Sequence, residues 1–348
     1  MAAKKIFNGR ALFVDGEIIW VARGLSFWGI DRNGKRITQK YQIGSLLDRF
    51  IGNFRLTRQL LRVGIHHILP LKNSGYLVTV KKKTLILDAN GNIVNIFKDY
   101  KGNKPGHRGV CITPDGTIFF GEYTININND KPTSLYRSTD NGMSFQNILT
   151  FAKDEVRHIH FVQWDKYENC LWMGTGDKDY ECKLMRSTDN GETWEIVGEG
   201  SQLWRAIGVS FTEEALYWGT DAGSVPDPNC IIRMDRNTQQ IEKVQEIQGP
   251  GHGNAVLQDG TIYVSTGIEG GENEKDRYAH IWKCEKTGAP IEIMKQRKDI
   301  FPNIVQYGVL RFPMGLEISD VLIYTAYALV NAPENVFIEI EKRKTDNE

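Results

Sequence analysis

Six of the seven histidines in this chain of 348 residues stand just before short apolar runs that are typical of β-strands. One register repeats three times, with a histidine or an arginine eight residues ahead of a turn glycine, at His67, Arg108 and His252. The other histidines of this group are His66, His107, His158 and His160. Random placement would not repeat a register, so we predict that these residues occupy equivalent positions around one site.

The order of strands indicates which other side chains join them. In an antiparallel meander, the first strand begins on the side of the sheet where the second strand ends. Strand starts therefore add Arg157, Arg205 and Tyr307, and strand ends add Glu122, Tyr123, Asp177, Asp221 and Glu269. We predict that all of these groups share one face of the molecule.

These residue types suit acid–base chemistry on an anionic, hydroxylated ligand, for which an acidic glycan is the natural match. Arginine binds a carboxylate through two parallel hydrogen bonds, while histidine and tyrosine exchange protons. We assign catalytic roles to His158, His252, Tyr307, Glu122 and Asp177. Substrate binding is assigned to His67, His107, Arg108, His160, Arg205, Asp221 and Glu269.

Histidine side chains that converge from separate blades are also potential ligands of a divalent transition metal such as Mn, Fe or Zn. The candidate ligands are His67, His107, His158 and His252. His158 and His160 alternate toward one strand face, which is a weak indication of such a site. The identity of any cofactor stays open.

An internal repeat indicates how the chain positions these groups. Residues 138–145 (STDNGMSF) and 187–194 (STDNGETW) begin 49 residues apart. Asp-Asn-Gly is typical of a tight hairpin, in which the Asp side chain binds backbone N–H groups and Gly adopts a positive φ. Repeats of this length are typical of solenoids and propellers. We therefore interpret Asp140 and Asp189 as turn residues and not as catalytic ones.

Weaker copies extend the repeat over the chain. Six hairpins are led by Asp31, Asp88, Asp140, Asp189, Asp235 and Glu285. Seven apolar strands run in phase with them, at 18–21, 76–78, 118–121, 171–174, 216–219, 262–264 and 321–324. The pattern predicts an all-β fold, a seven-bladed β-propeller of four-stranded antiparallel blades that forms one domain over residues 1–348. A β-sandwich or β-helix is less favoured, because a repeat near 50 residues matches one blade.

The two octapeptides resemble the Asp-box (BNR) repeat, Ser-x-Asp-x-Gly-x-(Ser/Thr)-(Trp/Phe), of sialidase-like β-propellers. This resemblance implies the fold, with Asp-boxes at the hairpins between third and fourth strands. Sialidases of that superfamily have six blades and a nucleophilic tyrosine in the last blade, where Tyr307 lies in this chain. The early Arg-Ile-Pro element of sialidases is absent, and a complete arginine triad cannot be placed. Seven blades resemble certain polysaccharide lyases, some of which hold a histidine-ligated metal.

Three functions remain open. A sialidase-like glycosidase needs two carboxylates or a tyrosine–carboxylate pair, for which Tyr307 with Glu269 or Asp221 is available. A β-eliminating lyase that acts on uronates needs a base, a cation and an acid, which His, Arg and Tyr supply. The alternative is a non-catalytic scaffold or assembly factor, which has no need to collect titratable groups at one mouth. We therefore expect an enzyme that cleaves a glycosidic bond in an acidic glycan.

The amino-acid composition bears on the binding partners and on the cellular location. Lys+Arg and Asp+Glu number 43 each, so nucleic acid is not an expected partner. No run of 18 apolar residues occurs, and neither a membrane partner nor a signal peptide is expected. Five scattered cysteines without metal-binding spacing indicate a cytoplasmic protein.

Two further predictions concern the segment after the first blade and the N-terminal strand. Residues 42–64 are predicted to be a helical insertion between the first two blades, forming a lid on the histidine face, because Leu46, Phe50 and Phe54 recur at helical spacing. Arginines 49, 55, 58 and 62 accompany them. The last blade offers only three strands, so residues 4–7 are predicted to supply the fourth and close the ring.

Overall fold

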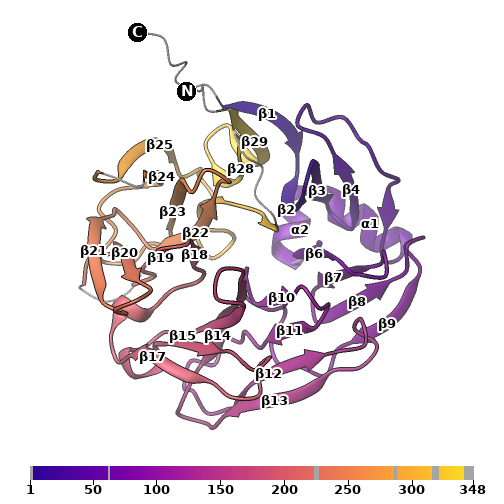
Figure 1. Cartoon of the computed structure of the whole chain (residues 1–348). Coiled ribbons are helices and arrows are strands. Elements are labelled where there is room, and N and C mark those ends of the chain that lie inside the picture. The colour runs from indigo at the N-terminus through magenta and orange to yellow at the C-terminus, as the bar shows by residue number, and fades with distance from the viewer. Residues whose placement is uncertain (1–2, 62, 223–226, 286–287, 316–320, 341–348) are drawn as a thin grey trace.

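The computed structural model describes residues 3–61, 63–222, 227–285, 288–315 and 321–340. It shows small antiparallel sheets arranged in a ring, and the ribbon colour passes round the ring in chain order (Figure 1). Apolar side chains join each sheet to the next, as where Phe161 and Trp172 pack with Trp218. This arrangement is a β-propeller.

Five of the six sheets stand as separate blades, in which the strands follow one another in chain order from the centre of the ring outward; in the first of them a later strand adds to the inner edge. The first contains β2 (Arg10–Asp15), β3 (Ile18–Arg23), β4 (Ser26–Ile30), β5 (Tyr41–Gln42) and the parallel β27 (Met314–Gly315). The next two contain β6 (His67–Pro70), β7 (Tyr76–Val80), β8 (Lys83–Leu87) and β9 (Ile93–Phe97), then β10 (Val110–Ile112), β11 (Ile118–Gly121), β12 (Thr133–Ser138) and β13 (Gln146–Phe151). The others contain β14 (His158–Asp165), β15 (Cys170–Gly176), β16 (Lys183–Ser187) and β17 (Glu195–Glu199), then β18 (Ser210–Phe211), β19 (Ala215–Gly219), β20 (Cys230–Asp235) and β21 (Ile241–Glu246).

The sixth sheet has eight strands and differs from the expectation of seven separate blades. It contains β22 (Gly251–Val256), β23 (Ile262–Ile268), β24 (Tyr278–Cys284), β25 (Ile291–Arg297), β26 (Gly308–Arg311), β28 (Val321–Leu329), β29 (Ala332–Ile340) and β1 (Lys4–Asn8). The physical reason is the length of β23. Its last residues, Gly267 and Ile268, extend past β22 and pair with Val309 and Gly308 of β26.

The N-terminal strand closes the ring, as predicted. β1 pairs antiparallel with β29, with Lys4 opposite Ile338 and Asn8 opposite Asn335. The first and the last described strands therefore lie side by side in the same sheet (Figure 1).

Deleting residues 1–8 is expected to lower the melting temperature by several degrees or to abolish soluble expression. The deletion removes every backbone hydrogen bond between β1 and β29 and exposes β29 as an open edge. Thermal unfolding of the full chain and the deletion variant checks this, and identical melting curves would refute closure by β1.

The two octapeptides form matching turns between β12 and β13 and between β16 and β17. Asp140 Oδ1 accepts hydrogen bonds from the Ser144 backbone N–H at 2.9 Å and from Ser138 Oγ at 2.8 Å. Asp189 makes the same two bonds at the same distances. These carboxylates hold hairpins together, in agreement with their interpretation as turn residues. Part of the hairpin led by Glu285 lies outside the described residues.

Two short helices occupy the insertion between β5 and β6, namely α1 (Leu46–Asn53) and α2 (Arg55–Leu61). Ser45 caps α1, with its hydroxyl accepting from the Asp48 backbone N–H at 3.1 Å. Arg58 of α2 points into the cavity that His67 also lines, so the insertion lies on the histidine side. Arg62 falls outside the described residues.

The propeller has two distinct faces. The "mouth face" carries the starts of the first strands, the turns between second and third strands, and the connections between blades. The "far face" carries the remaining turns, including both Asp-boxes. Two 3-10 helices, η1 (Asp179–Glu181) and η2 (Gln202–Trp204), lie in loops of the mouth face.

Candidate functional site

Strands β14 and β15 bring three predicted residues together in a group that we call the histidine cluster. His158 and His160 share one side of β14, and Asp177 follows β15. The two Nε2 atoms lie 2.8 Å apart, and Asp177 Oδ1 is 3.2 Å from each. Their Nδ1 atoms face backbone carbonyls, that of Thr124 at 3.0 Å and that of Ala206 at 3.1 Å. Both rings are therefore fixed in orientation.

The centre of the histidine cluster gathers acceptor atoms. If both Nδ1–H groups donate to the carbonyls, the two Nε2 atoms and Asp177 Oδ1 face one another. Arg157 Nη1 and Arg205 Nη2 contact Asp177 at 2.8 and 3.0 Å and supply positive charge beside it. Although burial opposes it, hydrogen bonds from the histidines and the charge of Arg205 hold the pKa of Asp177 far below its usual range. Burial lowers the pKa of His160 to about 4.

A second group, the "carboxyl cluster", lies next to the first. Asp221 follows β19, His252 lies on β22 and Glu269 follows β23. One side-chain oxygen or nitrogen atom of each lies within 4.8 Å of the others, and His252 Nε2 is 2.8 Å from Glu269 Oε1. Arg205 joins the two clusters, because its Nη2 is also 3.2 Å from Asp221 Oδ2.

The two carboxyl groups of this cluster have opposite proton affinities. Burial raises the pKa of Asp221 to about 7, and the negative charge of Glu269 adds to the rise against the effect of Arg205. Although burial opposes it, the hydrogen bond from His252 lowers the pKa of Glu269. Asp221 Oδ1 and His252 Nδ1 are buried without a hydrogen-bond partner among the described residues. A carboxylic acid beside an ionised carboxylate is the arrangement of an acid and a base.

Two tyrosines border these clusters. The Tyr123 ring stacks on His158 with centroids 4.1 Å apart, and the Tyr307 ring centroid is 6.4 Å from that of His252. Limited contact with water, together with the charges of Asp177 and Asp221, raises the pKa of Tyr123. Tyr123 therefore stays protonated near neutral pH and can donate a hydrogen bond.

Beside Tyr307 lies a cavity of about 410 Å³ that we call the arginine cavity. Its cationic lining consists of Arg10, Arg58, Arg311, Lys81 and Lys104, and no Asp or Glu lies among its described lining residues. Behind the lining, Glu334 accepts hydrogen bonds from both Arg10 and Arg58.

Arg311 is the least compensated charge of the arginine cavity. Burial lowers its pKa, and its Nε has no hydrogen-bond partner in the described part of the chain. Its guanidinium lies over the Tyr327 ring, 5.5 Å from the centroid, and no carboxylate of a described residue pairs with it. An anion in this cavity would supply the missing counter-charge.

His67 and His107 belong to the arginine cavity and not to the histidine cluster. His67 Nδ1 is 2.6 Å from Thr79 Oγ1, and its Nε2 is 2.9 Å from the Gly106 carbonyl oxygen. His107 Nε2 is 2.9 Å from the Phe312 carbonyl oxygen. Burial lowers the pKa of His67 to about 3.

The four histidines proposed as metal ligands therefore lie in three places. His67 and His107 line the arginine cavity, while His158 and His252 belong to different clusters. Each has hydrogen-bond partners of its own, so the described residues do not assemble the expected four-histidine set. Within each smaller cluster, Arg205 already contacts a carboxylate that a metal would need.

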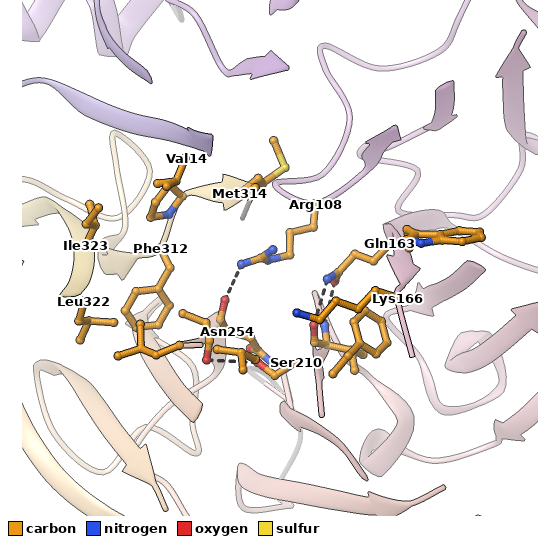
Figure 2. A pocket seen from close by; sticks show the side chains of 18 of the residues that line it. Val14, Arg108, Gln163, Lys166, Ser210, Asn254, Phe312, Met314, Leu322 and Ile323 are labelled. Carbon is orange, nitrogen blue, oxygen red and sulfur yellow. Dashed lines mark hydrogen bonds between the residues drawn. The ribbon is translucent and has the colours of Figure 1, made fainter. Parts of the chain in front are cut away.

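Arg108 lies at the opposite end of the channel from its expected place. It lines a cavity of about 230 Å³ with Gln163, Lys166 and Phe312, at the ends of the inner strands (Figure 2). Its guanidinium donates to the Asn254 carbonyl oxygen (Figure 2). Its neighbour His107 faces the arginine cavity. His107 and Arg108 are the two central residues of a turn that is closed by the Gly109 N–H, which donates to the Gly106 carbonyl oxygen at 3.0 Å.

Glu122 is also not at the mouth. Its fully buried carboxylate accepts from the backbone N–H groups of Lys101 at 2.7 Å and Ser134 at 2.9 Å, and from the Tyr136 hydroxyl at 3.2 Å. These bonds fix the turn after β11. Glu122 is therefore a structural residue, and its catalytic assignment is corrected.

Sequence reasoning missed the arginine cavity. Arg10 begins an inner strand, but it stands six residues before its turn glycine, Gly16, and so falls outside the eight-residue register. Arg58 lies in the segment that the sequence predicts to be a helical lid. Arg311 and Glu334 do not belong to any local sequence motif. Only the folded chain brings these four residues together.

No protein family model matches the chain, and no curated protein sequence matches it. Solved structures do share its fold. A catalytically inactive virginiamycin B lyase from Staphylococcus aureus with quinupristin has 12% identity and a TM-score of 0.61, over 98% of this chain and 99% of that one. An oligogalacturonate lyase in complex with manganese has 11% identity and a TM-score of 0.60, over 98% and 91%.

The extracellular domain of BT4673 from B. thetaiotaomicron has 12% identity and a TM-score of 0.58. The match covers 98% of this chain but 40% of that one, so the chain spans about two fifths of its length. At these identities the likeness establishes the fold alone. The chain is a β-propeller protein, and its function must be argued from its site.

Proposed function

We propose that the chain is a carbohydrate-active enzyme that cleaves a glycosidic bond in an acidic glycan, with a sialate or uronate unit. The observation that carries this proposal is the arginine cavity beside the carboxyl cluster. A sugar carboxylate supplies the counter-charge that Arg311 lacks, and Tyr307 lines the cavity close to His252. Arg10, Arg58 and Arg311 are candidates for the carboxylate-binding triad that the sialidase-like resemblance implies.

The carboxyl cluster supplies an acid and a base for cleavage of the glycosidic bond. Asp221, protonated in part near neutral pH, gives its proton to the leaving oxygen. His252 is oriented by Glu269 through Nε2, which leaves Nδ1 to take a proton. In hydrolysis that proton comes from water, and in β-elimination it comes from the carbon beside the carboxylate. The histidine cluster acts on the carboxyl cluster by holding Arg205 in place.

We further propose that the ring is a sevenfold repeat. The eight-stranded sheet divides into β22–β25 and a second set made of β26, β28, β29 and β1, each with the strand order of the separate blades. The β23–β26 pairing is then a local link between two blades. This count supports a likeness to seven-bladed propellers and not to six-bladed ones.

The function is tested by incubating the purified protein with acidic oligosaccharides that contain uronate or sialate, and with neutral ones of equal length. We expect cleavage of the acidic substrates only. Mass spectrometry then separates hydrolysis, which adds water, from β-elimination, which does not. Binding without cleavage would favour a non-catalytic scaffold, and cleavage of neutral substrates alone would contradict the role of the arginine cavity.

Replacing Arg311 with glutamine is expected to raise KM for the acidic substrate about tenfold or more, while kcat changes less. The substitution removes a charge that contacts the substrate carboxylate in ground and transition states alike. The melting temperature should stay equal or rise, because a buried charge without a carboxylate partner is costly to the fold. Steady-state kinetics and thermal unfolding measure both effects, with Arg137→Gln on the far face as the matched control.

A further inference from the structure

Large apolar side chains are exposed mainly on the mouth face of the described structure. Helix α1 exposes Leu46 (79%), Leu47 (67%) and Phe50 (62%), and the loop 299–307 exposes Ile300 (96%) and Ile304 (89%). We call these five side chains the apolar rim. On the far face the comparable residues, Ile37, Met143 and Tyr167, are scattered over separate turns.

Contacts of Arg55 link the helical insertion to the loop 299–307, the two segments that carry the apolar rim. Arg55 at the start of α2 lies 2.6 Å from Asp299 of the loop, measured from Nη2 to Oδ2. Its guanidinium also lies over the Phe301 ring, 4.7 Å from the centroid. These contacts hold the helices against the loop, although the two segments are far apart in sequence.

The helices do not bury their apolar side chains within the described chain. An amphipathic helix normally packs its apolar face on the core. In α1 the buried residue is Gly52, which packs near Gly24, while the leucines and Phe50 face outward. Large apolar side chains that are exposed together on one face indicate an interaction site.

Exposed cations border the apolar rim. Lys81 and Lys82 form the turn between β7 and β8, and Lys83 begins β8; all three are exposed. Arg49 of α1 is half-buried and donates to the Ser45 carbonyl oxygen at 3.4 Å. Lys81 Nζ contacts the Leu61 carbonyl oxygen of α2 at 3.0 Å, which places this turn beside the helices.

The two acidic residues of the same surface are already engaged within the fold. Asp48 accepts from Ser45 Oγ at 2.7 Å, and Asp299 contacts both Arg55 and Lys298. Asp48 keeps its negative charge, because a hydroxyl donor does not neutralise a carboxylate, but the three exposed lysines outnumber it. The net charge that borders the rim is therefore positive, and it complements an anionic surface.

We propose that the apolar rim docks the protein on the surface of an anionic lipid bilayer. Interfacial helices place apolar side chains among the acyl chains and cations near anionic headgroups, which is the arrangement of α1 and the lysine turn. None of the described helices is long and apolar enough to cross a membrane. No membrane partner is expected from the sequence because it has no run of 18 apolar residues, but docking on a surface needs no spanning segment.

Docking in this orientation brings the arginine cavity close to the bilayer, because Arg58 of α2 lines that cavity. Under the proposed function, the substrate would then be an acidic glycan carried at a membrane surface. Docking itself does not depend on that function and is measured without substrate.

The test is co-sedimentation with vesicles of phosphatidylcholine alone or mixed with phosphatidylglycerol. We expect binding to the mixed vesicles that weakens with salt. The variant Leu47→Ser/Phe50→Ser/Ile300→Ser should bind at least tenfold more weakly, and Lys81→Ser/Lys83→Ser should lose the preference for phosphatidylglycerol. The control Ile37→Ser/Met143→Ser/Tyr167→Ser on the far face should bind as the unmodified chain does. Because all the replaced side chains are substantially exposed, folding should persist, and circular dichroism checks it.

Three results would overturn the proposal. The first is absence of binding by the unmodified chain, and the second is equal binding by the rim variant. The third is a dimer in light scattering that the rim variant abolishes while vesicle binding is absent, which would make the rim an interface between two copies. Cleavage of soluble acidic oligosaccharides by the rim variant would show that the proposed function stands apart from docking.

Discussion

Replacing Asp221 with asparagine is expected to lower kcat on the acidic substrate by about 10²- to 10⁴-fold, the usual contribution of a positioned acid. Asparagine has the same shape and can still accept from Arg205, but it has no proton to give to the leaving oxygen. The melting temperature should change little. Steady-state kinetics beside thermal unfolding measures both quantities, and Asp235→Asn in an exposed hairpin is the matched control.

The pH profile provides a second readout of the same residue. Because the folded state raises the pKa of Asp221 to about 7, activity should fall as the pH rises through that value. The same shift favours the folded state fully below the ordinary aspartate pKa of about 3.9, and this contribution disappears as the pH rises through about 7. Full activity of Asp221→Asn, or a profile unchanged across that range, would remove Asp221 from the mechanism.

Replacing Glu334 with alanine is expected to destabilise the protein by about 3–5 kcal/mol, as is usual when one partner of a buried ion pair is removed. Glu334 contacts both Arg10 and Arg58, and its side chain is only 6% exposed. Although burial opposes it, the two arginines lower the pKa of Glu334, so the carboxylate is ionised in the fold. Denaturant unfolding measures the change in the free energy of unfolding.

An exposed pair provides the control for Glu334. Glu192, whose side chain is 63% exposed, contacts Arg137 at 2.6 Å, and Glu192→Ala should cost about 0–1 kcal/mol. Added uronate should restore part of the stability that Glu334→Ala loses, since a ligand that binds only the folded state stabilises it. Equal losses in the two variants would contradict the role of Glu334 as the counter-ion of the cavity.

The fold could be read from local signals. Asp140 and Asp189 sit in hairpins whose hydrogen bonds involve residues within four positions, so the sequence alone specified those turns. The β1–β29 closure followed from a count of strands. Pairing between β23 and β26 could not be foreseen, because it depends on how far Gly267 and Ile268 extend past a neighbouring strand.

The candidate site was predictable where side chains follow the strand register and not elsewhere. His158, His160 and Asp177 meet because β14 and β15 are adjacent in the sequence and antiparallel. Glu122 also follows a strand end, but its side chain turns toward the Ser134 backbone, which no spacing rule expresses. The arginine cavity depends on Arg58 meeting Glu334 across 276 positions of the chain, which has no local signature.

The eight-stranded sheet connects the carboxyl cluster with the arginine cavity. Glu269 of the carboxyl cluster immediately follows β23, and Arg311 of the arginine cavity ends β26. Because β23 pairs with β26, the backbone sets the distance between these two side chains. Blades that meet only through side chains can slide slightly, whereas hydrogen-bonded strands keep their register. The site is therefore built as a rigid template, and a stiff ligand of matching length can enter it without induced fit.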